Sequence, residues 1–169
     1  SGWSGGAFLW QSADDYGRTG QNLYFPNGSD SPTYAKNYYY DGDGNLDLYV
    51  GFARGARTRN KLYRNVPSAD AEPGRHFVDV AASLGVDDFG TTRQPVFIDY
   101  DGDGDVDLYV AFRDRPNALY RNQAGRFVDV GPALGLADSR KSVGAVWLDV
   151  DRDGDLDLYV ANDITDNAY

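Results

Sequence analysis

A ten-residue segment occurs three times in the chain with almost the same letters. The copies are DGDGNLDLYV (41–50), DGDGDVDLYV (101–110) and DRDGDLDLYV (151–160), and their starts lie 60 and then 50 residues apart. Shorter segments recur between them in a fixed order, with LYRN at 62–65 and 119–122 and FVDV at 77–80 and 127–130. Self-similarity at such a spacing is the signature of a repeat architecture. The chain therefore has to fold as a series of similar units.

Each unit is built from short segments with the composition of β-strands. In the second unit these segments carry β-branched and aromatic residues between turn-forming residues, at 94–100, 107–112, 117–122 and 126–130. Four strands in about 50 residues match the size of one propeller blade. The sequence thus predicts an all-β fold of about three and a half four-stranded antiparallel propeller-type blades. Helical turns are expected near 81–86 and 131–136.

The predicted units form one repeat domain over 1–169. A degenerate partial unit (1–34) precedes two full units (35–85 and 86–136) and a truncated third unit (137–169). Within the partial unit, either 5–12 or 22–28 resembles strands of the later units. An incomplete ring leaves unpaired strand edges and an exposed apolar face, which promote association. We therefore expect an incomplete propeller, completed by another chain or by sequence missing from this one.

The charged residues narrow the range of functions. The net charge of −10 argues against nucleic acid or an anionic membrane as partner, and no apolar run is long enough to span a membrane. The acids are 25 Asp and one Glu, which favours turn loops with a local role over a general solubilising surface. The chain has no cysteine and one histidine, His76, so thiol, zinc and Ser-His-Asp chemistry are largely excluded. We expect no enzymatic activity.

The repeated acidic loops have the spacing of a calcium site. Numbered from Asp99, the second loop places Asp at positions 1, 3, 5 and 9, Gly104 at position 6 and Asp105 at position 7. Alternate carboxylates converge in such a turn, and Ca²⁺ takes about 6–8 oxygens in flexible geometry, with the position-7 carbonyl and water completing the set. The predicted ligands in the two complete loops are Asp99, Asp101, Asp103, Asp105 and Asp107, and Asp149, Asp151, Asp153, Asp155 and Asp157.

The first loop is an altered copy and a third candidate site. Its position 1 is Tyr39, which leaves Asp41, Asp43, Asn45 (through its carbonyl) and Asp47 as ligands. A missing charged ligand weakens the site unless a water or a distant group replaces it. We therefore expect two calcium ions at the complete loops, with the occupancy of the first loop left open.

Other interpretations of these loops fit less well. An EF-hand requires a bidentate Glu at position 12 and flanking helices, whereas position 12 is Val110 or Val160 and strands flank the loops. Mg²⁺ demands stricter octahedral geometry and keeps its waters, so a cage of protein carboxylates favours Ca²⁺. Ordinary solvated hairpin turns are the remaining alternative, but four Asp within nine residues repel one another without a cation.

These motifs resemble the FG-GAP/VCBS repeats of integrin-α-like β-propellers, which carry D-x-D-x-D-G-x-x-D loops. The similarity covers roughly 34–169. The LYRN and FVDV segments, with LGV at 84–86 and LGL at 134–136, are most similar to the bacterial and cartilage-acidic-protein-type branch. The resemblance implies four-stranded blades in which a usually structural calcium ion ties the first strand to the second. It also implies a typically extracellular protein. The chain departs from the family pattern in three ways: Tyr39 stands at position 1 of the first loop, the N-terminal unit is weak, and the number of blades is small.

Three function classes follow from these expectations. The first is an extracellular, non-enzymatic repeat module, stabilised by calcium, that acts in adhesion or self-assembly and can form fibres. The second is a lectin-like module that binds a glycan through aromatic side chains and the arginines of 53–60 and 112–117. The third is an accessory or catalytic propeller of a polysaccharide-degrading enzyme. Expected partners are further copies of the chain, other strands of a longer propeller, or a glycan or protein ligand.

Overall fold

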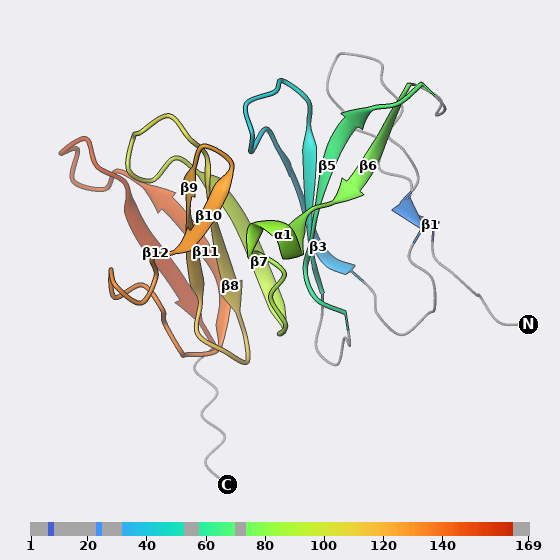
Figure 1. Ribbon diagram of the computed structural model, residues 1–169. Coiled ribbons are helices and arrows are strands. Elements are labelled where there is room, and N and C mark those ends of the chain that lie inside the picture. Colours follow the sequence, from blue (N-terminus) through green and yellow to red (C-terminus); the bar gives the residue numbers. More distant parts are fainter. Residues whose placement is uncertain (1–6, 9–22, 25–31, 53–57, 70–73, 164–169) are drawn as a thin grey trace, which may run out of the picture.

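The computed structural model describes residues 7–8, 23–24, 32–52, 58–69 and 74–163 (Figure 1). Apart from one short helix, the regular elements of this part of the chain are strands. The strands are β1 (Ala7–Phe8), β2 (Leu23–Tyr24), β3 (Pro32–Tyr38), β4 (Asp47–Phe52), β5 (Lys61–Pro67), β6 (Arg75–Asp79), β7 (Thr92–Ile98), β8 (Asp107–Phe112), β9 (Ala118–Gln123), β10 (Arg126–Asp129), β11 (Ser142–Leu148) and β12 (Asp157–Asn162). The helix is α1 (Ala81–Leu84).

The strands form antiparallel sheets in chain order. Two four-stranded meanders run β3-β4-β5-β6 and β7-β8-β9-β10, and β11 pairs with β12. A four-stranded meander is the blade of a propeller. The predicted all-β, blade-type fold is therefore confirmed, and the described strands form an open series of blades instead of a closed ring (Figure 1).

The partial unit predicted at the N-terminus is described only in part. A two-stranded sheet pairs Ala7 with Tyr24 and Phe8 with Leu23, so both of its candidate strand segments contribute a strand. Residues 32–34, predicted as the end of that unit, belong to β3 of the first meander. The remainder of that unit, and residues 164–169 at the end of the predicted third unit, lie outside the described residues.

The sheets pack face to face through the strand that opens each unit. β3 lies against β7, and β7 lies against β11. Every residue of β8 is buried, because this strand has an apolar neighbour on both sides. Leu108, Val110 and Phe112 join the core shared with the first sheet, whereas Tyr109 and Ala111 join the core shared with β11 and β12. The second blade is thus sandwiched between its neighbours.

Buried asparagines bridge adjacent blades. The Asn117 side chain accepts a hydrogen bond from the Phe112 amide (2.7 Å) and donates to the hydroxyls of Tyr109 (2.9 Å) and Ser142 (2.8 Å). Ser142 opens β11 in the next unit. Asn60 makes the corresponding contacts in the first unit, with Phe52, Tyr49 and Thr92 at the start of β7. This repeated polar link fixes the register between successive blades.

The predicted helical turns lie in the connections between blades. Helix α1 covers Ala81–Leu84, and the equivalent stretch after β10 forms a hydrogen-bonded turn. Both connections return the chain to the first strand of the next blade, which brings the three acidic loops to corresponding places.

Candidate metal centre

Each acidic loop connects the first strand of a unit to its second strand. The first loop (39–47) joins β3 to β4, the second (99–107) joins β7 to β8, and the third (149–157) joins β11 to β12. The three loops share a backbone conformation, because position 4 is left-handed in all of them (φ 69° at Gly42, 71° at Gly102 and 64° at Arg152). Position 6 is a left-handed glycine in every copy.

Each loop gathers three carboxylates into one cluster. Within a cluster, one oxygen of each residue lies within 4.8 Å of the others; the clusters are Asp41–Asp43–Asp47, Asp99–Asp101–Asp107 and Asp149–Asp151–Asp157. Oxygens that bind one Ca²⁺ at about 2.3–2.6 Å lie at most about 5 Å apart. The spacing and the all-oxygen donor set therefore fit a calcium ion in all three loops.

The remaining predicted ligands lie outside these clusters. In the second loop, the Asp103 carboxylate accepts the Asp105 amide (2.9 Å), and the Asp105 carboxylate accepts the Ala124 amide (2.9 Å). In the first loop, the backbone amide of Asn45 donates a hydrogen bond to the Asp43 carboxylate (2.8 Å). Asp153 and Asp155 repeat the contact between positions 5 and 7 in the third loop. In the second and third loops a side-chain role at position 5 stays a prediction, as does a carbonyl role at position 7 in all three.

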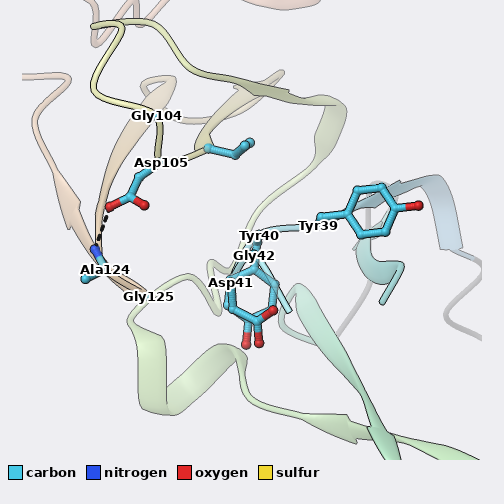
Figure 2. A pocket seen from close by; sticks show the side chains of 9 residues that line it. Tyr39, Tyr40, Asp41, Gly42, Gly104, Asp105, Ala124 and Gly125 are labelled. Atoms are coloured by element: carbon cyan, nitrogen blue, oxygen red, sulfur yellow. Dashed lines mark hydrogen bonds between the residues drawn. The ribbon is translucent and has the colours of Figure 1, made fainter. Parts of the chain in front are cut away.

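The first loop uses a different set of positions from the other two. Its cluster takes positions 3, 5 and 9, whereas the other clusters take positions 1, 3 and 9. Tyr39 is 45% exposed, and Figure 2 shows its ring turned away from the second loop. A small pocket between the two loops is lined by Tyr39, Asp41, Asp105 and Ala124, among others (Figure 2). Loops of neighbouring blades thus lie at the same end of the fold.

In the first two loops the position-9 aspartate is the most deeply buried member of the cluster, whereas Asp157 of the third loop is exposed. Asp107 is fully buried and accepts the backbone amides of Asn122 (2.7 Å) and Tyr100 (3.0 Å). Burial raises the pKa of Asp107 to about 6, and the charges of Asp101 and Asp103 add to this shift. A carboxylate with a raised pKa close to other carboxylates gains from a bound cation.

Asp47 occupies the same place in the first loop. It is 1% exposed, and one of its oxygens is buried without a hydrogen-bond partner among the described residues. Burial raises its pKa to about 7, with further contributions from Asp41 and Asp43. The other oxygen accepts the Asn65 amide (2.9 Å). This buried carboxylate therefore fits the role of a cation ligand in the first loop, whose occupancy the sequence leaves open.

The LYRN segment supports the first two loops from the third strand, a role that the sequence pattern did not predict. The last residue of the segment, Asn65 or Asn122, donates its amide to the position-9 aspartate and its side chain to the carbonyl at position 8. Asn122 also donates to the Tyr40 carbonyl of the preceding blade (2.8 Å). The signal was present in the sequence, because the motif follows each of the first two loops in the same order along the chain.

The arginines proposed for acidic sugars are held in ion pairs where they are described. Arg113 pairs with Asp163 (2.9 Å), Arg115 with Asp88 (2.7 Å) and Arg59 with Asp87 (3.4 Å). Arg115 also lies over the Phe112 ring. These contacts serve the connections between blades and do not favour a sugar site.

The left-handed position 4 predicts opposite effects of two substitutions. A non-glycine residue in this conformation costs about 1–2 kcal/mol. We expect Arg152→Gly to stabilise the third loop by about 1 kcal/mol and Gly102→Ala to destabilise the second loop by a similar amount. Chemical denaturation in the presence of chelator measures both changes. Equal effects of the same sign would contradict the shared backbone conformation.

Successive four-stranded meanders with an acidic loop after each first strand define a propeller-type repeat domain. The family model described as FG-GAP-like repeat matches residues 39–110 and 99–160, which together span well over half of the chain. The chain therefore belongs to the FG-GAP-like repeat family. A search of curated proteins finds no match. No helix among the described residues is long and apolar enough to cross a membrane.

Proposed function

We propose that this chain is a non-enzymatic, extracellular repeat module in which calcium stabilises each blade, and that it acts in adhesion or self-assembly. The observation that carries the calcium role is the recurrence of the three-carboxylate cluster between the first and second strands of each unit. In the second unit the cluster also reaches the third strand, because Asp107 accepts the Asn122 amide of β9. A bound ion at this place joins three strands of one blade.

The carboxylate ligands of the clusters are consistent with the calcium affinity expected of an extracellular module. The clusters offer carboxylate oxygens alone, and extracellular modules bind Ca²⁺ at roughly 10⁻⁴–10⁻³ M. An ion that binds only the folded state stabilises it by about 1.4 kcal/mol per site at a free concentration about ten times Kd. Calcium is thus a structural component of the blade in this proposal.

Thermal unfolding in calcium, in magnesium and in chelator tests the calcium role. We expect the midpoint to be highest in calcium, with magnesium giving a smaller rise because it fits a strict octahedron. Equal midpoints in calcium and chelator would refute the proposal. A larger rise in magnesium than in calcium would reassign the metal.

The self-assembly role rests on the open face of the β11–β12 sheet. Tyr109 in the second blade is 0% exposed because the third sheet covers it, whereas its equivalent, Tyr159, is 66% exposed. Val146 and Val150, on the same open side, are 49% and 67% exposed. By the repeat, this face corresponds to the surface of the second blade that packs against a following sheet. A contiguous exposed apolar face of this kind marks an interaction surface.

Placing a charge on this face is expected to abolish association. Tyr159→Arg should convert concentration-dependent oligomers of the full chain into monomers, because an unpaired charge cannot enter an apolar interface. Sedimentation velocity over a range of protein concentrations measures the change. Val128→Arg on the outer strand β10, where Val128 is 48% exposed, is the matched control and should not alter association. A wild-type chain that stays monomeric throughout would contradict self-assembly.

A further inference from the structure

An arginine from the third strand reaches the acidic loop in the same way in both complete blades. Arg121 of β9 places Nε 2.9 Å from an Asp101 oxygen and a terminal nitrogen 3.3 Å from an Asp103 oxygen. Arg64 of β5 places Nε 2.6 Å from Asp41 and a terminal nitrogen 3.8 Å from Asp43. In both loops the guanidinium therefore bridges positions 3 and 5.

The contacted carboxylates are also members of the metal clusters. Asp41 and Asp43 both belong to the cluster of the first loop, and Asp101 belongs to that of the second. A carboxylate has enough lone pairs to accept from an arginine and to bind an ion at once. The two positive charges nevertheless repel each other when they share a carboxylate. Arginine pairing and metal binding are therefore coupled.

The coupling has a definite sign. Without metal, each guanidinium offsets the mutual repulsion of the carboxylates and ties the loop to the third strand. With metal present, the same charge is less favourable, because the ion already neutralises most of the carboxylate charge. Since it stabilises the ion-free state relative to the ion-bound state, the arginine must weaken metal binding.

We propose that Arg64 and Arg121 act as built-in cations, which hold the first and second loops closed in the ion-free protein and lower the metal affinity of these loops. This proposal rests on the proposed calcium function and adds to it a pair of residues that sets the affinity. Both are positioning residues, because they act through the ligand carboxylates. Weak binding suits a protein that meets calcium at the millimolar level outside cells.

The test compares two double variants of the full chain by calorimetric titration with calcium at low ionic strength. We expect Arg64→Gln with Arg121→Gln to bind calcium about threefold to tenfold more tightly at the two loops, with partial exposure of the pairs limiting the effect. Arg64→Lys with Arg121→Lys keeps both charges and should stay close to the wild-type affinity. A purely geometric role of the guanidinium fork would instead make the lysine variant behave like the glutamine variant.

Arg126→Gln is the control for loss of one positive charge outside the acidic loops, because Arg126 is exposed at the start of the neighbouring strand β10. In chelator, the glutamine double variant should unfold at a lower temperature than this control. Unchanged or weaker calcium binding by the glutamine double variant, while the wild type binds, would overturn the proposal. If the wild type shows no calcium binding, the calcium function fails instead. The chelator comparison then still decides whether the arginines hold the ion-free loops, and equal midpoints would reject that role.

Discussion

Replacing Asp107 by alanine is expected to lower the free energy of unfolding in calcium by about 4 kcal/mol and to remove the ion bound at the second loop. Asp107 is 0% exposed, and its two oxygens accept the amides of Tyr100 and Asn122. Each buried amide left without an acceptor costs about 1–3 kcal/mol. Urea denaturation in calcium and in chelator measures both parts of the loss.

Asp105→Asn is the control for this substitution. It removes a charge from the same loop but keeps an oxygen that can accept the Ala124 amide, and the Asp105 side chain lies outside the carboxylate cluster. We expect a change below about 1 kcal/mol and a retained calcium response. If Asp107→Ala and Asp105→Asn are equally destabilising, the buried hydrogen bonds of Asp107 at position 9 do not stabilise the second loop more than an exposed side chain does.

Asn117→Ala is expected to cost about 3 kcal/mol with or without calcium, because it breaks the polar link between the second and third blades. The substitution leaves the buried Phe112 amide without its acceptor and removes partners from the hydroxyls of Tyr109 and Ser142. These groups are about 0% exposed, so water does not replace the lost bonds. Urea denaturation in chelator isolates this loss from any effect of the metal.

The comparison for Asn117→Ala is Gln123→Ala at the exposed far end of β9, the strand that Asn117 precedes. This substitution should change stability by less than about 0.5 kcal/mol. Asn60→Ala offers an independent repetition in the first unit, where the side chain makes the corresponding contacts. A loss at Asn117 that disappears in chelator would show that this side chain acts through the metal loop and not as a link between blades.

The repeat made most of the fold predictable from the sequence. Motifs that recur in a fixed order predicted strands that pair in the same way, and the two meanders confirm this prediction. The acidic loops were predictable for the same reason, since the spacing of their aspartates alone places several carboxylates in one turn. The sequence also showed that Tyr39 replaces the aspartate at position 1 of the first loop. The carboxylate cluster of that loop accordingly contains the aspartate at position 5, Asp43, in place of one at position 1.

The contacts between distant segments could not be predicted in this way. Asn122 donates to Tyr40 in the preceding blade, 82 residues away, and no local pattern encodes such a pairing. Of the asparagines that link blades, Asn117 was visible only as the first residue of a predicted strand, and Asn60 only as the last residue of a loop segment. Their role depends on a hydroxyl from the next unit, Thr92 or Ser142, which only the packing of the blades brings close.

The most direct test of the central claim is a calorimetric titration of the chelator-treated full chain with calcium, joined to thermal unfolding of the same samples. We predict saturable binding of two or three ions and a midpoint that rises with the free calcium concentration, as for a ligand of the folded state. Absence of saturable heat, together with the same midpoint in calcium and chelator, would contradict the claim that calcium stabilises the blades.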